Sequence, residues 1–239
     1  MKAFAATDVG VERKINQDCV YYSLTEVGPL PNLFIVADGM GGHKAGDIAS
    51  RYTVDNFVAR VKDASGKDTA DVIGDAVTWV NRALIEKAQE SSDYMGMGTT
   101  LVVATISDNM LKVANVGDSR LYVIGNDIRQ ITRDHSLVEE MVSLGEIDRK
   151  AARTHKRKNI ITRAIGGEKE VEAEMFCVEL QPRDKVLMCS DGLSNMIEDE
   201  DILKIVKDGP TISEAAERLI DTANENGGKD NISVILIEP

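Results

Sequence analysis

The chain has 239 residues, of which 43% are hydrophobic and 28% are charged, and its formal net charge is −12. This length and composition predict a soluble globular protein with a sizeable core. The negative charge argues against binding to nucleic acid or to an anionic membrane surface, because both would be repelled. Acidic residues around a bound cation are an exception to this argument, since the cation neutralises part of their charge.

The sequence contains no sign of a boundary between two domains. It has only five prolines and no Gly/Ser tract, charge block or internal repeat, so we expect one domain over residues 1–239. Cys19, Cys177 and Cys189 are far apart and form no C-x-x-C motif, which is typical of small buried hydrophobic residues in a reducing compartment. No signal peptide and no apolar run of about 20 residues is evident, so we expect a cytoplasmic protein.

Short apolar runs along the chain predict β-strands. They are Ala3–Thr7, Cys19–Leu24, Leu33–Ala37, Leu101–Ile106, Leu111–Val116, Leu121–Ile124, Val186–Cys189 and Ile232–Ile237. The three runs between residues 101 and 124 are separated by only a few residues, which cannot hold a crossover helix. We therefore expect these three strands to form an antiparallel meander.

Helical periodicity lies between the groups of strands. It predicts helices from about residue 45 to 61, within residues 68–90, and after Thr211, which forms a T-x-x-E capping box with Glu214. Two groups of helices separated by consecutive strands favour an α+β fold in which helices cover antiparallel sheets. Residues 136–165 are more polar and predict either a mobile flap over a surface site or an ordinary two-helix connection.

Five aspartates share one sequence context at the ends of the predicted strands. Asp38, Asp118, Asp191 and Asp230 each lie near the end of an apolar run beside Gly or Asn, and Asp18 directly precedes such a run. One Asp-Gly after a strand usually indicates a turn. Together, however, these strands can end at a common edge, where clustered carboxylates repel one another unless cations lie among them. Carboxylate and carbonyl oxygens suit Mg²⁺ and Mn²⁺, so the pattern favours a metal site without defining its reaction.

Eight motifs in order give the chain a resemblance to a known family. They are "TDVGVERKINQD", "FIVADGMGGH", "MGTTL", "VANVGDSRLY", "ITRDHS", "ITRAIG", "VLMCSDGLSN" and "GGKDNISVILI", which span residues 7–237. The sequence resembles the metal-dependent protein phosphatases of the 2C family, and in particular the compact bacterial serine/threonine phosphatases. The resemblance implies a four-layer α-β-β-α sandwich of two antiparallel sheets flanked by helices, with the metal centre at one end between the sheets.

The resemblance also implies a role for each matching residue. Asp38 would bridge two metals, the Gly39 carbonyl would bind the second metal, and Asp191 and Asp230 would complete the first. Asp18 would hold metal-bound water, and Asp118 with Asp191 would match a third, weaker metal position. The implied cofactors are Mn²⁺ or Mg²⁺, as two core ions and a third.

The implied reaction is direct hydrolysis of phosphoserine or phosphothreonine in proteins. A water that bridges two cations would attack phosphorus in line while the alkoxide leaves. Arg13 matches the phosphate-binding arginine of the family, whose planar fork suits two phosphoryl oxygens. His43 would either donate a proton to the leaving group or line the pocket. Gln17 stands where many family members carry glutamate, so affinity for the second metal would be weaker.

The remaining histidines and basic residues have simpler interpretations. His135 in "RDHS" is expected to orient a loop through hydrogen bonds, and His155 is expected to be solvated. The run from His155 to Lys158 is either a solvated surface segment or a contact for an anionic substrate. The expected partners are phosphorylated proteins and a cognate serine/threonine kinase, with no nucleic acid or membrane partner, and the protein is expected to be a monomer.

Two other functions are compatible with the same residues. A docking module that keeps the fold would have no need of Arg13, Asp38, Asp191 and Asp230, and it would not bind Mn²⁺. A metallophosphatase for small phosphorylated metabolites would share the site, but it would show higher kcat/KM on metabolites than on phosphopeptides.

Overall fold

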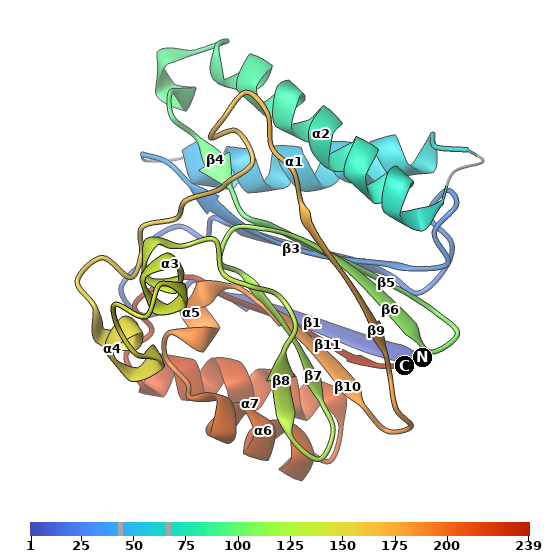
Figure 1. The fold of residues 1–239 in the computed structure, drawn as a ribbon, viewed down its shortest axis with the longest axis vertical. Coiled ribbons are helices and arrows are strands. Elements are labelled where there is room, and N and C mark those ends of the chain that lie inside the picture. The colour runs from blue at the N-terminus through green and yellow to red at the C-terminus, as the bar shows by residue number, and fades with distance from the viewer. Residues whose placement is uncertain (43–44, 66–67) are drawn as a thin grey trace.

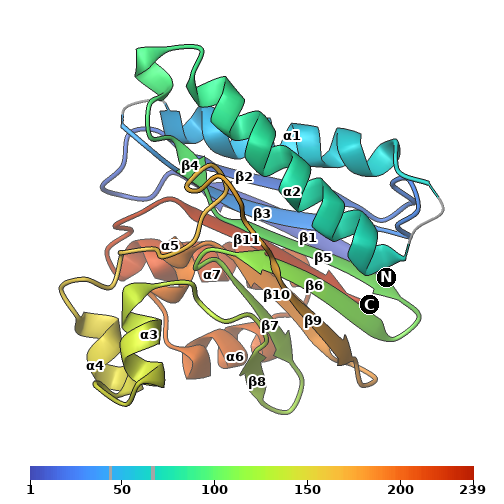
Figure 2. The same ribbon diagram turned by 45° about the horizontal axis from the view of Figure 1, so that its top comes forward.

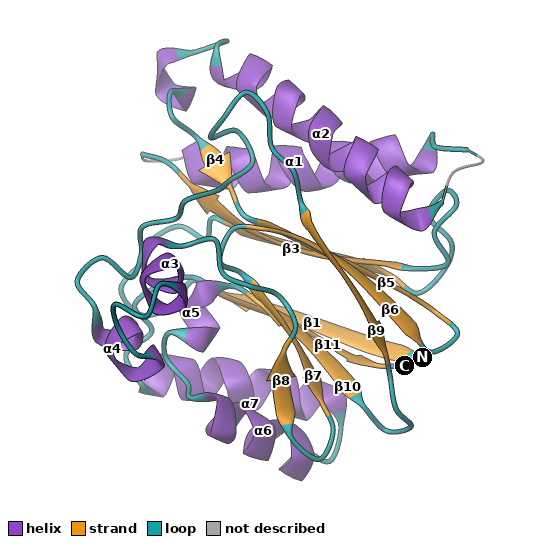
Figure 3. Cartoon of the chain, in the orientation of Figure 1, coloured by secondary structure: helices purple, strands orange, loops and turns teal. Residues whose placement is uncertain are grey.

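The computed structural model describes residues 1–42, 45–65 and 68–239. Two antiparallel sheets are stacked face to face, and each carries helices on its outer side (Figure 1). Helices therefore form the two outer layers and strands the two inner layers, as Figure 3 shows. This α-β-β-α sandwich confirms the predicted α+β fold.

The first sheet holds both ends of the chain. Its strand order is β1-β11-β10-β7-β8. The strands are β1 (Lys2–Asp8), β7 (Arg120–Ile124), β8 (Ile128–Gln130), β10 (Lys185–Cys189) and β11 (Ile232–Glu238). Because β1 pairs with β11 along its whole length, the two termini lie side by side (Figure 1).

The second sheet has the order β2-β3-β5-β6-β9, and the short β4 pairs with the end of β3. Its strands are β2 (Asp18–Ser23), β3 (Leu33–Met40), β4 (Gly98–Thr99), β5 (Leu101–Ser107), β6 (Met110–Val116) and β9 (Glu174–Glu179). The predicted strands are all present, whereas β4, β8 and β9 were missed. These three are short, or alternate too weakly in polarity to stand out in the sequence.

The predicted meander over residues 101–124 is wrong in its last step. β5 pairs with β6, but β6 then pairs with β9, while β7 pairs with β8 and β10 in the other sheet. The link from Gly117 to Ser119 carries the chain across the sandwich, and Gly117 has a φ of 108° that favours glycine. Leu121 and Val123 then pack in the core between the sheets. Short connections exclude a crossover helix, but they do not exclude a change of sheet.

Two pairs of helices cover the outer faces of the sheets. α1 (Ala45–Lys62) and α2 (Thr69–Ala88) lie over the second sheet, and α6 (Asp199–Asp208) and α7 (Ile212–Glu225) lie over the first (Figure 2). The predicted cap is present, because the Thr211 side chain accepts the backbone N–H of Glu214. Apolar residues fill all three gaps between the layers, and this burial fixes the sheets against each other. No helix among the described residues is long and apolar enough to cross a membrane.

Short helices gather at one end of the sandwich. The segment 136–165, called the flap below, contains α3 (Leu137–Ser143) and α4 (Arg149–Thr154) and lies near α5 (Asp191–Ser194), as Figure 1 shows. A bidentate ion pair joins its two helices: Arg149 of α4 donates to both carboxylate oxygens of Glu139 of α3, at 2.6 and 3.0 Å. The 3₁₀ helix η1 (Ser92–Tyr94) directly precedes β4 of the second sheet.

The cysteines differ in their burial. Cys189 on β10 is buried and Cys19 on β2 is half-buried, but Cys177 is exposed. The prediction that all three are buried is therefore wrong for Cys177. It lies on β9, an edge strand whose alternate residues face solvent, so that only one side of the strand can be covered.

Candidate metal centre

Five aspartates from both sheets meet at one end of the sandwich. Asp18 at the start of β2 and Asp38 near the end of β3 are direct partners across their two strands. The charges of Asp18, Asp191, Asp118 and Asp230 all raise the pKa of Asp38, which places the five carboxyl groups close together. The structure thus brings together all five of the aspartates that sequence context singled out, although they are as many as 212 residues apart in the chain.

Backbone and hydroxyl contacts hold the main chain of Asp38 in place. Its N–H donates to Thr100 Oγ1 at 2.9 Å, and its carbonyl accepts from Thr100 N and Thr99 Oγ1, both at 2.9 Å. The preceding five residues of β3, Leu33 to Ala37, are fully buried. The strand therefore has little freedom to move, and it fixes the direction of the Asp38 side chain.

Glycines keep the space beside Asp38 open. A Cβ on Gly39 would lie 2.0 Å from Gly46 O and 2.6 Å from Gln17 O, so no larger residue fits. Gly46 faces it from α1, and a Cβ there would lie 2.6 Å from the Gly39 carbonyl oxygen. The Gly39 carbonyl therefore keeps room on the α1 side because Gly46 has no side chain.

Asp18 is clamped from the opposite sheet. Its Oδ2 accepts the Ser190 hydroxyl at 2.7 Å, and the Ser233 hydroxyl also hydrogen-bonds its carboxyl group. Asp18 is only 4% exposed, and its Oδ1 is buried without a hydrogen-bond partner. One oxygen is thus used for positioning, and the other is left for a ligand in the cluster.

Asp191 and Asp118 also each leave an oxygen without a partner. Asp191 begins α5, and its Oδ2 accepts Asn195 Nδ2 at 2.8 Å, while its Oδ1 has no partner. Asp118 lies in the link between β6 and β7, is 7% exposed, and also has an unpaired Oδ1. Buried carboxylate oxygens are rarely left unpaired unless another ligand satisfies them.

Burial and mutual repulsion raise the pKa values of the cluster. Burial is the main cause for Asp18, whose pKa rises to about 7, and for Asp191, whose pKa rises to about 6. The pKa values of Asp38 and Asp118 also rise well above their ordinary range, first through burial and then through the neighbouring carboxylates. A divalent cation would reverse this repulsion and favour the ionised carboxylates.

The donor set fits a hard divalent cation. Three buried aspartate oxygens without partners and a backbone carbonyl are the ligands that Mg²⁺ and Mn²⁺ prefer. Among the residues the structure describes, no three acidic, thiol or imidazole side chains converge tightly enough to enclose an ion by themselves. An ion here would therefore take further ligands from the Gly39 carbonyl and from water, as magnesium sites commonly do.

Arg13 lies at the edge of the same cluster. It comes from the segment between β1 and β2, and its Nη2 donates to Asp230 Oδ2 at 2.7 Å. The Arg13 side chain is 48% exposed, so its guanidinium remains accessible from solvent. Its role in phosphate binding stays a prediction, which rests on the ability of a planar guanidinium to contact two phosphoryl oxygens at once.

The three histidines of the chain were each given a predicted role, and the structure describes two of them. His43 lies outside the described residues. His135 acts as predicted by ordering a loop, because its Nδ1 accepts Gly117 N–H at 3.1 Å and its backbone N–H donates to Gly117 O at 2.9 Å. His155 is half-buried rather than solvated, and its Nδ1 accepts Arg157 N–H.

The basic run of the flap reaches the cluster through one residue. Lys158 is half-buried and donates from Nζ to Asn195 Oδ1 at 2.9 Å, and Asn195 in turn donates to Asp191. Lys156 and Arg157 beside it are exposed. The run is therefore solvated at Lys156 and Arg157, whereas His155 and Lys158 are half-buried and Lys158 points back to the site.

Sequence reasoning missed several residues that support the aspartates. Ser190, Asn195, Thr100, Gly46 and Asn231 all contact a cluster residue or its backbone. Two of them could have been found from the sequence by their position beside a predicted site aspartate, since Ser190 directly precedes Asp191 and Asn231 directly follows Asp230. Thr100 and Gly46 have no such signal, because only folding brings them to β3.

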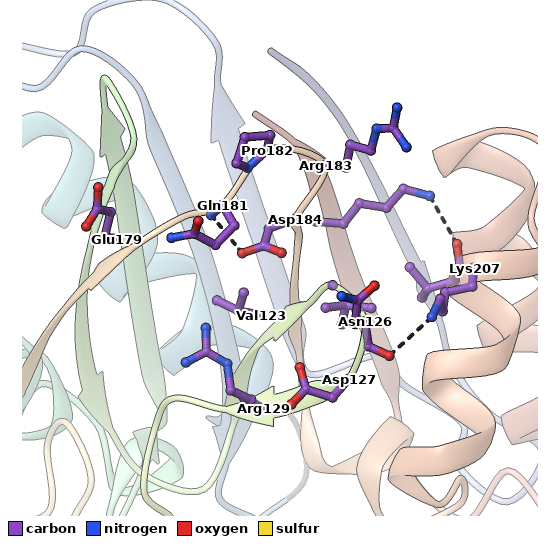
Figure 4. A pocket seen from close by; sticks show the side chains of 14 residues that line it. Val123, Asn126, Asp127, Arg129, Glu179, Gln181, Pro182, Arg183, Asp184 and Lys207 are labelled. Atoms are coloured by element: carbon purple, nitrogen blue, oxygen red, sulfur yellow. Dashed lines mark hydrogen bonds between the residues drawn. The ribbon is translucent and has the colours of Figure 1, made fainter.

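A cavity of about 650 Å³ lies at the other end of β7 and β10 and is separate from this cluster. Figure 4 shows its walls, which come from the β7–β8 turn, the β9–β10 connection and the end of α6. The turns satisfy its central charges: Asp184 Oδ2 accepts Gln181 N–H, and Lys207 Nζ donates to Asn126 O (Figure 4). Asp184 and Lys207, two of the charged side chains that line this cavity, are therefore paired with neighbouring backbone groups.

The fold and the site together define a class of protein: a double-sheet sandwich with a buried carboxylate cluster at one end that fits divalent cations, and an exposed arginine beside it. Comparison with known proteins gives the family. The family model for protein phosphatase 2C matches residues 11–236. The chain belongs to the protein phosphatase 2C family.

Individual relatives cover most of the chain. It is 45% identical over 214 residues to the serine/threonine phosphatase Stp of Listeria innocua, covering 86% of this chain and 84% of that protein. It is 37% identical over 244 residues to the protein phosphatase PhpP of Streptococcus pneumoniae, covering 99% and 97%. The crystal structure of the serine/threonine phosphatase Stp1 from Staphylococcus aureus has a TM-score of 0.93 at 36% identity, covering 100% and 95%.

A metal-bound structure is also among the similar ones. The catalytic domain of the serine/threonine protein phosphatase PstP, in complex with two manganese ions, has a TM-score of 0.86 at 35% identity. It covers 98% of this chain and 96% of that chain.

Proposed function

We propose that this chain removes phosphate from phosphoserine and phosphothreonine in proteins, with Mn²⁺ or Mg²⁺ held by the carboxylate cluster. Asp38, Asp191, Asp230 and the Gly39 carbonyl would hold two core ions. Asp118 with Asp191 would hold a third, and Asp18 would hold metal-bound water nearby. The observation that carries this proposal is the set of unpaired, buried oxygens on Asp18, Asp118 and Asp191.

The reaction assigns a separate task to each part of the site. Bound divalent cations would supply Lewis acidity, which lowers the pKa of water and offsets the negative charge on the phosphoryl oxygens. Arg13 binds and orients the phosphoryl group through its fork of N–H donors. The rigid strand β3 and the Ser190 contact keep Asp38 and Asp18 aligned, so that little reorganisation is needed during the reaction. His43 is proposed as either the proton donor to the leaving alkoxide or a lining residue.

Phosphate release from a phosphothreonine peptide, with Mn²⁺ and with EDTA, tests the proposal. We expect Mn²⁺-dependent release by the native protein and a loss of at least about 100-fold in Asp38→Asn, because a lost metal ligand removes most of the Lewis acidity. Asp221→Asn on the exposed face of α7 is the matched control, and it should keep full activity. Hydrolysis that survives both EDTA and Asp38→Asn would rule out the metal mechanism.

A second part of the proposal concerns the setting of the enzyme. We infer a single phosphatase domain over residues 1–239 that works as a monomer in the cytoplasm and opposes a cognate serine/threonine kinase. The serine/threonine phosphatases among its relatives support the opposition to a kinase. Light scattering of the purified protein at several concentrations tests the monomer, and a dimer at micromolar concentration would contradict it.

A further inference from the structure

Arg13 lies in a segment that has no regular secondary structure. Residues 9–17 connect β1 to β2 as an irregular loop, called the arginine loop below. Such loops are mobile unless contacts outside the loop hold them. A phosphate-binding guanidinium, however, is effective only if it is held near its working position. The contacts that fix the arginine loop are therefore of functional interest.

The side chain of Asn231 makes three hydrogen bonds, all to the backbone of the arginine loop. Its Nδ2 donates to Val9 O at 2.8 Å and to Ile15 O at 3.0 Å, and its Oδ1 accepts Gln17 N–H at 2.8 Å. Asn231 is 3% exposed, so water cannot replace these partners easily. Both donors of the amide are used, and its oxygen is used as well.

These bonds hold the two ends of the loop together at the base of the arginine. Val9 begins the loop, whereas Ile15 and Gln17 lie near its end. The side-chain amide of Asn231 therefore connects the beginning of the loop to its end. Gly228 O adds a second attachment by accepting the N–H groups of Val11 and Glu12. Arg13 lies between these attachments and extends toward Asp230, the residue directly before Asn231.

The adjacent residues Asp230 and Asn231 therefore have two different tasks. Asp230 Oδ2 accepts the guanidinium of Arg13, while Asn231 holds the backbone that carries it. α5 keeps this pair in place, because a Cβ on Gly192 would lie only 2.0 Å from Asn231 O. The pair joins the metal ligands to the phosphate-binding arginine through one rigid connection.

From this geometry we infer that Asn231 is a positioning residue for Arg13, and that it sets the affinity of the site for the phosphoryl group. The inference rests on the proposed role of Arg13 in phosphate binding. Only an asparagine satisfies all three partners. An aspartate of the same shape could still accept from Gln17, but it would direct an oxygen at the carbonyls of Val9 and Ile15 and repel them.

Asn231→Ala, Asn231→Asp and Arg13→Ala test this inference with inorganic phosphate as the probe. In the Mn²⁺-loaded protein, each should raise the inhibition constant of phosphate about tenfold or more, because the hydrogen bonds from the Arg13 guanidinium to phosphate are removed in Arg13→Ala and misaligned in the two Asn231 variants. Asn231→Ala should add no further loss to Arg13→Ala, because it acts through the same guanidinium. The Mn²⁺ dissociation constant should change by less than about threefold, because the ion's own ligands remain. Asn126→Asp on the exposed β7–β8 turn makes the same chemical change as a control.

Hydrogen exchange of the metal-free protein gives a second readout that does not depend on activity. The Gln17 amide should exchange faster in Asn231→Ala and stay protected in Asn231→Asp, whereas amides of β11 stay protected in both. Independent losses that multiply in the double variant, or an unchanged phosphate constant in Asn231→Asp, would overturn the positioning role. Continued activity of Asp38→Asn would instead refute the proposed function, so the two failures are distinguishable.

Discussion

Replacing Asp18 with asparagine should stabilise the metal-free protein while impairing the metal-loaded enzyme. Burial, together with the charges of Asp191 and Asp230, raises the pKa of Asp18 from its ordinary value of 3.8 to about 7. The folded chain therefore binds a proton at Asp18 more tightly than the unfolded chain does. The contribution of Asp18 to the free energy of unfolding is therefore greatest below pH 3.8, and it is lost as the pH rises from 3.8 toward 7.

The size of this effect follows from the same two values. The difference between 3.8 and about 7 corresponds to about 4 kcal/mol of unfolding free energy at pH 8, as an upper bound. Relaxation and water penetration lower it, so we expect about 2 kcal/mol. In Asp18→Asn the new side chain would carry no charge, its oxygen would still accept from Ser190, and its amide could donate to the neighbouring carboxylates.

Urea unfolding in EDTA at pH 5 and pH 8 measures this prediction. Asp18→Asn should gain about 2 kcal/mol over the native protein at pH 8 and clearly less at pH 5, where most of the native Asp18 is already protonated. Saturating Mn²⁺ should favour the native protein instead, because the ion binds only the folded state. A gain of equal size at both pH values, or a loss at pH 8, would refute the reasoning. Asp221→Asn is the control and should show no such dependence on pH.

Three further predictions concern the flap, His135 and the cysteines. Shortening the flap (residues 136–165) should change kcat/KM among phosphopeptides more than on a small aryl phosphate; equal losses on both would contradict a role in substrate choice. Burial and Arg163 lower the pKa of His135, so its contribution to stability should be lost as the pH falls below 6.5, and His135→Ala should remove that dependence in urea unfolding. The Ala variant should also cost about 1–3 kcal/mol at pH 7, since it leaves the buried Gly117 N–H without its acceptor. Burial raises the pKa of Cys189 to about 12, so a thiol reagent at pH 8 should modify exposed Cys177 in the folded protein and reach Cys189 only after unfolding; fast double labelling would contradict the burial.

Much of this protein follows from its sequence alone. Apolar runs and helical periodicity placed the strands and the long helices, because local burial patterns are written directly into residue order. Aspartates at the ends of those runs indicated a hard cation, because strand ends of a sandwich converge. The ordered motifs around Asp38, Asp191 and Asp230 identified the family, and the comparisons confirmed both the fold and the family.

Tertiary structure decided how the chain uses those residues. The sequence could not show that β7 leaves the sheet of β6, because pairing depends on long-range contacts and not on the length of the link. It could not show that Asp18 is buried and clamped by Ser190, so its raised pKa could not be foreseen. Nor could it show that Asn231 holds the arginine loop, since the two segments lie more than 200 residues apart in the chain. Residue types and their order are local information, whereas distances between segments exist only once the two sheets have packed together.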